Sequence, residues 1–201
     1  MSADETTAGN DGGAPACRAD KGRPVVVPGV LVQVCGLGVL IMGDSGIGKT
    51  ACALDLIARG CFWIADDAIV LERRGGALYG RGHERTRDLI AVRSRGLLNA
   101  GSVVGAEALL KETQVHVIVQ FTRRFHGQGA DRDVEGESFL DIEGLPVRCR
   151  RVAAVGGSGL MADEVIACVN RYLGRRERGS KEQDNEQADA RGNHHGTVRF
   201  R

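Results

Sequence analysis

The stretch that decides the fold is residues 36–50, which read Gly36-Leu37-Gly38-Val39-Leu40-Ile41-Met42-Gly43-Asp44-Ser45-Gly46-Ile47-Gly48-Lys49-Thr50. A short apolar run ends in a glycine-rich segment, and a helical pattern follows at once over residues 51–58. The order strand, loop, helix and the spacing G-x-x-x-x-G-K-[ST] are those of a phosphate-binding loop, or P-loop. The alternative is a chance glycine-rich turn, and the flanking strand and helix argue against it.

The residue types in this loop suit a bound phosphate. Glycines allow the backbone to adopt positive φ and to bring its N–H groups close to phosphate oxygens. The helix that starts near Lys49 directs the positive end of its dipole at the same place. Lys49 would extend along the β- and γ-phosphates, and the Thr50 hydroxyl would ligate the Mg²⁺ that bridges them. The expected phosphate-binding residues are Gly43, Asp44, Ser45, Gly46, Ile47, Gly48, Lys49 and Thr50.

Composition narrows the class of protein. The chain has 201 residues, of which 42% are hydrophobic and 26% charged, values close to globular averages. Its formal net charge of +1 gives no support to a nucleic-acid partner. The six cysteines include no C-x-x-C pair, so we interpret them as reduced thiols. Residues 1–10 are not a secretory signal and no apolar run could span a bilayer, which favours a cytoplasmic protein without membrane contact.

The pattern along the chain predicts one domain between two polar ends. Residues 1–24 are rich in glycine and charge and are expected to be a disordered leader. Residues 25–173 carry the apolar runs of a P-loop kinase-like domain, and residues 174–201 are expected to be a disordered polar tail. Strands are predicted at 25–27, 30–35, 61–65, 115–121, 139–142, 145–147 and 152–155, a hairpin at 72–80, and helices at 84–99 and 160–173.

Two adjacent carboxylates, Asp66 and Asp67, follow the apolar run at residues 61–65 and are predicted to close that strand. In P-loop folds an acid at a strand end lies beside the phosphates, where it can hold Mg²⁺, orient a water molecule or take a proton from an incoming hydroxyl. The alternative is a polar turn or a helix N-cap. The P-loop upstream favours the functional interpretation.

Several segments resemble one family when they are taken together. They are Gly29-Val30-Leu31-Val32, residues 36–50, Leu54-Asp55-Leu56-Ile57-Ala58-Arg59-Gly60 and Ile64-Ala65-Asp66-Asp67. Val92-Arg93 and Gly96-Leu97-Leu98-Asn99 look like a degraded copy of a second signature of that family. The chain thus resembles the catalytic domain of bacterial HPr kinase/phosphorylase over roughly residues 27–173.

The resemblance implies an α/β fold in which a P-loop (Walker A) kinase core combines a mixed β-sheet with flanking helices. It also implies that ATP and Mg²⁺ serve to phosphorylate a serine of the phosphocarrier protein HPr, or of another serine-bearing acceptor, in a homo-oligomer that is hexameric in the family. Matching positions make Asp66 the base toward the serine and place Asp67 in support of it or of the metal, together with Thr50. Lys49 and Arg93 complete the implied catalytic set.

The chain departs from the family pattern at two notable positions. Pro28 stands where family members place a histidine, and Ala91 stands where they place a glutamate. The family's longer architecture also has an N-terminal domain, for which the 201 residues leave no room. Three hypotheses follow: a serine kinase of HPr-kinase type, a nucleotide-binding regulatory protein without turnover, and a P-loop kinase of a small metabolite.

Overall fold

The computed structural model of the chain describes residues 22–92, 95–123, 137–154 and 157–192. The strands are β1 (Val25–Val34), β2 (Leu37–Gly43), β3 (Phe62–Arg74), β4 (Ala77–Gly82), β5 (Leu89–Val92), β6 (Gly96–Asn99), β7 (Glu112–Thr122), β8 (Glu137–Ile142) and β9 (Leu145–Ala153). The helices are α1 (Lys49–Ala58), α2 (Ala100–Val104), α3 (Ser158–Gly192) and the 3-10 helix η1 (Ala106–Ala108).

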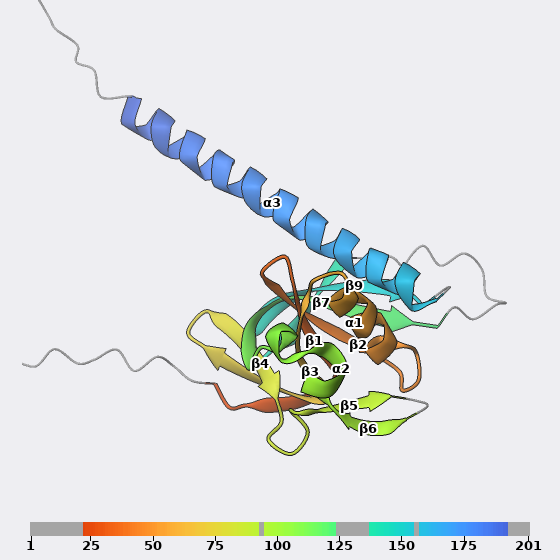
Figure 1. Cartoon of the computed structure of the whole chain (residues 1–201). Coiled ribbons are helices and arrows are strands. Elements are labelled where there is room, and N and C mark those ends of the chain that lie inside the picture. The colour runs from red at the N-terminus through yellow and green to blue at the C-terminus, as the bar shows by residue number, and fades with distance from the viewer. Residues whose placement is uncertain (1–21, 93–94, 124–136, 155–156, 193–201) are drawn as a thin grey trace, which may run out of the picture.

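Seven strands form one mixed sheet in the order β2-β1-β3-β4-β7-β9-β8 (Figure 1). β7 pairs with β2 as well as with β4, so five of these strands close into a ring, and β9 and β8 extend from it. The β2–β7 and β7–β9 pairs are parallel and the remaining pairs of this sheet are antiparallel. The predicted mixed sheet with flanking helices is therefore confirmed.

Alternation along the strands divides the apolar residues between two cores. In β1, Val30 and Val32 belong to the core that packs under α1 and α3, whereas Leu31 points into the second core, on the other face of the sheet. β2 repeats the pattern, with Val39 and Ile41 in the first core and Leu40 in the second. Such alternation follows from the two-residue period of a strand. The first core fixes α1, and with it the glycine-rich loop, on the sheet.

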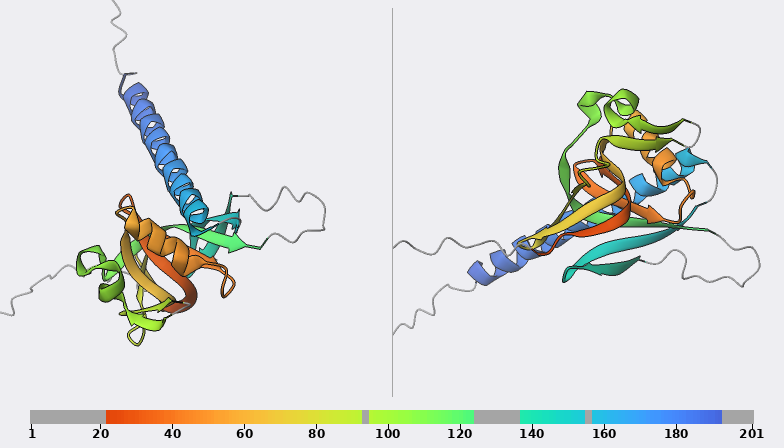
Figure 2. Two further views of the ribbon diagram at one scale, coloured as in Figure 1. Left: turned by 45° about the vertical axis from the view of Figure 1, so that its right-hand side comes forward. Right: turned by 90° about the horizontal axis from the view of Figure 1, so that it is seen from below.

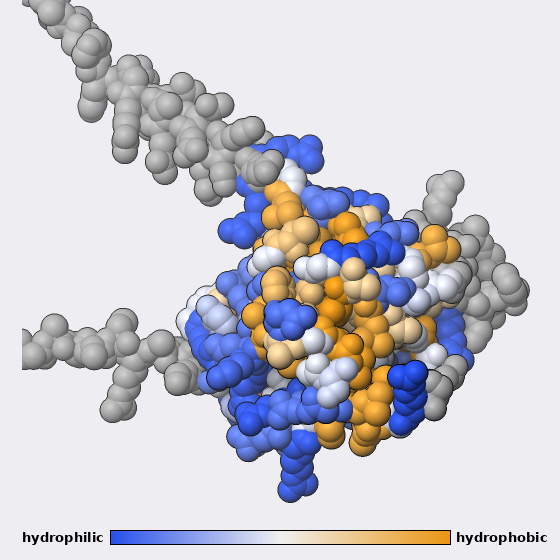
Figure 3. Space-filling view, in the orientation of Figure 1, coloured by the Kyte–Doolittle hydropathy of each residue, from blue (hydrophilic) through white to orange (hydrophobic). Residues whose placement is uncertain are grey.

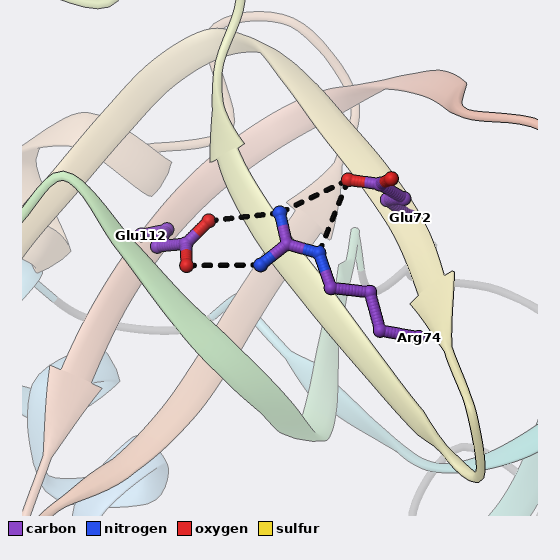
Figure 4. A network of polar contacts seen from close by, with 3 residues as sticks. All are labelled: Glu72, Arg74 and Glu112. Atoms are coloured by element: carbon purple, nitrogen blue, oxygen red, sulfur yellow. Dashed lines mark hydrogen bonds and ion pairs between the residues drawn. The ribbon is translucent and has the colours of Figure 1, made fainter. Parts of the chain in front are cut away.

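Charged residues join β3 to β7 across the intervening strand β4. The Arg74 guanidinium donates to Glu112 on β7 at 2.9 and 3.0 Å and to Glu72 at 3.0 and 3.2 Å (Figure 4). The same guanidinium lies over the ring of Tyr79 on β4, 4.8 Å from its centroid. This network connects neighbouring strands of the ring at the end where β4 pairs with β7.

Two predicted strand ends are wrong, because strands continue through them. β1 runs through Pro28 and Gly29, and β3 runs through Asp66 and Asp67 as one strand of 13 residues. The two strands are antiparallel neighbours in which Pro28 pairs with Ala68 and Gly29 with Asp67. Pairing with a long neighbour keeps both segments extended even though proline and paired acids are turn signals in isolation.

The helix predicted over residues 84–99 is also wrong. The segment contains the two-stranded hairpin β5–β6, in which Leu89 pairs with Asn99 and Val92 with Gly96. Gly96 has φ +76°, whereas residues of a right-handed helix have negative φ, and this positive value suits the hairpin connection. Runs of four residues are too short for apolar spacing to separate strand from helix.

The chain after Gly174 differs from the predicted disordered tail, because α3 continues as helix to Gly192. In Figures 1 and 2 this helix extends far beyond the sheet. Residues 175–192 contain no apolar face but are rich in Arg, Glu, Gln, Lys and Ala, which have high helix propensity. The predicted leader falls outside the described residues, apart from residues 22–24.

Candidate active site

The glycine-rich loop connects the end of β2 at Gly43 to the start of α1 at Lys49. Gly43, Gly46 and Gly48 have φ of +141°, +76° and +111°, the positive region that the sequence predicts. A Cβ on Gly43 would lie 2.6 Å from the Phe121 carbonyl oxygen, so glycine also permits the loop to leave the sheet beside β7. The loop therefore sits at the carboxyl ends of two parallel strands and at a helix N-terminus, where backbone N–H groups are available for an anion.

Lys49 folds back over the loop that precedes it. Its Nζ donates to the carbonyl oxygens of Gly43 at 2.8 Å and of Asp44 at 3.0 Å. These two bonds hold the ammonium group against the loop rather than in bulk solvent. A positive charge at the helix N-terminus adds to the helix dipole in attracting a phosphate.

Thr50 and Asp66 bring α1 and β3 into contact beneath the loop. The Thr50 hydroxyl donates to the Asp66 carboxylate, with Oγ1 3.1 Å from Oδ2 and 3.3 Å from Oδ1. Asp66 also accepts the backbone N–H of Asp67 at 2.9 Å and that of Ala91, in the hairpin, at 3.2 Å. One carboxylate thus links the helix after the glycine-rich loop, the central strand β3 and the hairpin strand β5.

The two neighbouring acids occupy different environments. Asp66 is only 5% exposed, and burial raises the pKa of its carboxyl, although hydrogen bonds from Ala91, Thr50 and Asp67 act in the opposite direction. Asp67 is exposed and has φ +70°, a left-handed conformation that is unusual inside a strand. Consecutive residues of a strand point to opposite faces, so the Asp66 carboxylate reaches Thr50 while that of Asp67 is exposed.

An open cavity of about 1120 Å³ lies over the loop and the two acids. Its other walls come from Pro28 and Gly29 on β1 and from the hairpin, through Ala91, Val92, Gly96 and Leu97. This volume lies slightly above the ordinary range for small-molecule sites, about 300–1,000 Å³. Figure 3 shows apolar residues at the surface near the hairpin, where Leu97 is 69% exposed.

The structure brings the predicted site residues together, apart from one that is not among the residues it describes. The loop residues that line the cavity are Gly43, Asp44, Ser45, Gly46, Gly48, Lys49 and Thr50, and Asp66 and Asp67 line it with them. Ile47 belongs to the same loop and packs against the first core. Arg93 lies outside the described residues. Sequence reasoning missed the backbone N–H of Ala91 as a partner of Asp66, because a main-chain donor leaves no signal in residue type.

A mixed-sheet α/β protein with a glycine-rich loop at a helix N-terminus and two acids beneath it is the class that the fold and site define. The chain belongs to the HPr Serine kinase C-terminal domain family, which it matches over residues 23–183.

Relatives with assigned names support the same family. The chain is 36% identical over 150 residues to a protein named HPr kinase/phosphorylase of Ralstonia pickettii, covering 74% of this chain and 46% of the relative. It is 35% identical over 153 residues to a protein of the same name from Clostridium botulinum, covering 76% and 50%. The chain therefore spans about half the length of the curated relatives it matches.

A solved structure carries the same fold. The structure of the Hpr(Ser) kinase/phosphatase from Coxiella burnetii superposes with a TM-score of 0.64 at 21% identity, covering 75% of this chain and 99% of that one. No helix in the described ranges is both long and apolar enough to cross a membrane.

Proposed function

We propose that this protein transfers a phosphoryl group from ATP to a serine hydroxyl, with Mg²⁺ as the assisting cation. The observation that carries the proposal is the contact between Thr50, the first helix residue after Lys49, and the buried Asp66. In phosphoryl transfer of this class the P-loop hydroxyl and a neighbouring acid hold the metal beside the phosphates. The names of the relatives agree with such chemistry.

The residues present fit a nucleotide phosphate and its metal. The backbone N–H groups between Gly43 and Thr50 would cradle the phosphates, and Lys49 would exchange its two carbonyl contacts for phosphate oxygens. No cluster of three or more His, Cys, Asp or Glu residues in the described part of the chain could hold a metal by itself. Mg²⁺ would accordingly be held by Thr50, a carboxylate and the nucleotide together, as this cation prefers.

The geometry favours an exchange of the roles that the family resemblance implied for the two acids. Both Asp66 oxygens already face Thr50, so we infer that Asp66 acts on the metal side, directly or through a metal-bound water. The exposed Asp67 lines the cavity without burial and can receive the proton of an incoming hydroxyl. Positioning of the hydroxyl against the phosphate then supplies most of the acceleration.

The proposed acceptor is a serine of the phosphocarrier HPr or of another protein. The exposed Leu97, at the wall of the cavity, gives an apolar contact for a macromolecular acceptor. Assembly into a homo-oligomer, hexameric as the family resemblance implies, and a cytoplasmic location remain parts of this proposal.

A nucleotide-binding regulatory protein without turnover is the second candidate function. Two cavity positions favour it: Pro28 and Ala91 stand where the family resemblance expects a histidine and a glutamate, and neither side chain can ionise. Such a protein would keep nucleotide affinity, because the loop and Lys49 are intact, and would lack part of the acid–base chemistry. A kinase of a small metabolite would use the same loop and differ in the acceptor.

One experiment separates these functions. The purified protein is incubated with radiolabelled ATP, Mg²⁺ and either HPr or small hydroxyl compounds, and compared with Lys49→Ala. Transfer to HPr that is lost in Lys49→Ala, at an unchanged melting temperature, supports the kinase. Nucleotide binding without product under every condition favours the regulator, and transfer by Lys49→Ala at the parental rate would exclude the proposed mechanism.

A further inference from the structure

His116 lies at an irregularity where β7 pairs with the strand that leads to the glycine-rich loop. Gly38 of β2 pairs with Val115 of β7, whereas the next residue of β2, Val39, pairs with Val117. The register of this parallel pair therefore passes over His116. One extra residue in one of two paired strands is the pattern of a β-bulge.

The neighbouring side chains show the same irregularity. Val115 and Ile118 both belong to the second core although they are three residues apart, and Val117 belongs to the first core. The His116 ring meets the ring of Tyr172 on α3 edge to face, with the centroids 6.1 Å apart. His116 and Val117 thus lie on the same side of the sheet, the side that α3 covers, although the ordinary period of a strand would alternate them.

The imidazole gives the backbone a partner at the bulge. Nδ1 of His116 accepts the backbone N–H of Gly38 at 3.1 Å. A ring nitrogen accepts a hydrogen bond only when it carries no proton, so this bond requires the neutral imidazole. The connection between β2 and β7 at this point therefore depends on the protonation state of one side chain.

The surroundings of the ring favour its neutral form. Burial lowers the pKa of His116 from its ordinary value of 6.5, a backbone hydrogen bond with Gln114 acts in the opposite direction, and the charge of Arg176 on α3 lowers the pKa further. On the other strand of the pair, Leu37–Gly43 contains no titratable group. Further charged residues on the α3 side line a small pocket with Tyr172, and they are Arg148, Arg150, Arg171 and Arg175.

The acid of β7 is already paired elsewhere. Glu112 accepts two hydrogen bonds from Arg74, at 2.9 and 3.0 Å. No acid is among the groups that shift the pKa of His116 in the part of the chain that the structure describes. A proton on the imidazole would therefore add a positive charge on the side of Arg176.

Gln114 offers the ring a second hydrogen-bonding arrangement. Its carbonyl oxygen lies so near Gly38 that a Cβ at that glycine would be 2.1 Å away. The hydrogen bond between His116 and the Gln114 backbone favours the protonated ring. An imidazolium has two N–H donors, so it can bind this carbonyl oxygen but cannot accept the Gly38 N–H. The two protonation states thus require different partners.

We propose that His116 is a pH switch between β2 and β7, in which the neutral imidazole holds the Gly38 N–H and protonation releases it. β2 continues from Gly38 to Gly43, so the released segment is the strand that carries the glycine-rich loop. This switch is separate from the kinase proposal and does not depend on it.

The direction of the effect follows from the shifted titration. The unfolded chain takes up a proton at His116 near pH 6.5, whereas the folded chain does so at lower pH. The stability that the neutral ring contributes is therefore complete above pH 6.5 and is lost as the pH falls below that value.

NMR of the full chain, labelled with ¹⁵N in histidine and glycine, tests the switch. At pH 7.5 the ring shifts of His116 should show Nδ1 without a proton, and the ring should titrate below 6.5. The hydrogen-exchange protection factor of the Gly38 amide should fall about tenfold or more as the pH passes below that midpoint.

Two variants assign this change to His116. His116→Asn places an oxygen at the position of Nδ1 and cannot titrate, so Gly38 should stay protected in acid. His83→Asn is the matched control, because Nδ1 of His83 accepts the Arg85 N–H at 3.3 Å within a turn. In the control Gly38 should lose protection as in the wild type.

A proton on Nδ1 at pH 7.5, or the same pH dependence of Gly38 protection in all three proteins, would overturn the proposal. If His116→Asn does not fold, the wild type decides alone. Coincident midpoints for the ring titration and for Gly38 protection then support the switch, and separate midpoints exclude it.

Discussion

The Thr50 hydroxyl lies 3.1 Å from Oδ2 of Asp66 and donates a hydrogen bond to a carboxylate that is only 5% exposed. This contact joins the first turn of α1 to the middle of β3. Burial of a carboxylate is unfavourable unless donors compensate it, and Thr50 is the side-chain donor among the three partners of Asp66. Loss of the hydroxyl therefore affects both the fold around Asp66 and the proposed metal position.

Thr50→Val removes this donor and keeps the shape of the side chain. We expect the variant to need at least tenfold more Mg²⁺ for half-maximal phosphoryl transfer, because one oxygen ligand of the cation is absent. Thr50→Ser keeps the hydroxyl and is expected to stay within a few-fold of the parent. Steady-state rates over a Mg²⁺ series provide the measurement, and equal Mg²⁺ dependence of the two variants would remove Thr50 from the metal site.

Asp66→Asn and Asp67→Asn should differ in what they impair. For Asp67→Asn we expect kcat to fall by about 10²-fold or more, with an unchanged Mg²⁺ requirement, because the proposed base is gone. Asp66→Asn should chiefly raise the Mg²⁺ requirement, since its contacts are with Thr50. The reverse assignment of these two phenotypes would restore Asp66 as the base.

Local motifs predict the loop well, and long-range pairing explains what sequence reasoning missed. The conformation of residues 43–50 depends on glycines within the segment itself, which adopt positive φ. Both the loop and the following helix are therefore recognisable without the rest of the chain. The position of Asp66 and Asp67 inside a strand depends on β1, where Val30 and Gly29 are their partners. The Ala91 N–H that reaches Asp66 depends on a hairpin whose short strands carry no clear period.

Gly38 is required for the close approach of β2 and β7. A Cβ at this position would lie 2.1 Å from the Gln114 carbonyl oxygen and 2.6 Å from Cγ2 of Thr113. Gly38→Ala should therefore destabilise the fold by about 2 kcal/mol or more, because the backbone must move. Gly76→Ala is the matched control, since a Cβ there meets nothing within 4 Å. Urea unfolding of both variants makes the comparison, and equal midpoints would contradict it.

Arg74→Met should weaken the junction of β3, β4 and β7. The expected loss of unfolding free energy is about 1 kcal/mol at pH 7, because the ion pairs are partly exposed. The hydrogen bond from Arg74 lowers the pKa of Glu112, so its contribution is present above the ordinary carboxyl pKa and is lost as the pH falls below it.

Urea titrations at pH 7 and pH 3.5 check this dependence. The difference between wild type and Arg74→Met should shrink at the lower pH. Arg74→Lys keeps the charge without the planar fork and should lie between them. A difference that is the same at both pH values would show that Arg74 acts by packing on Tyr79 alone.

Cys52 gives a test of how α1 packs on the sheet. Its side chain is fully buried in the first core, and burial, followed by the nearby charge of Asp55, raises the pKa of the thiol from 9.0 to about 12. Because the unfolded chain releases this proton more readily, the stability contributed by the buried thiol is complete below pH 9 and falls as the pH rises toward 12. The decline should approach about 1.4 kcal/mol per pH unit above pH 9.

Measurements of unfolding free energy between pH 8 and pH 11 should therefore fall more steeply for the wild type than for Cys52→Ala, in which this titration is absent. Other thiols whose pKa is raised, those of the partly buried Cys61 and the buried Cys149, titrate in both proteins and cancel in the difference. Iodoacetamide at pH 8 provides an independent check, because the exposed Cys35 should react in the folded protein and Cys52 only after unfolding. Parallel pH curves together with rapid labelling of Cys52 would mean that α1 opens readily from the sheet, so that Lys49 and Thr50 are not held in place before a nucleotide binds.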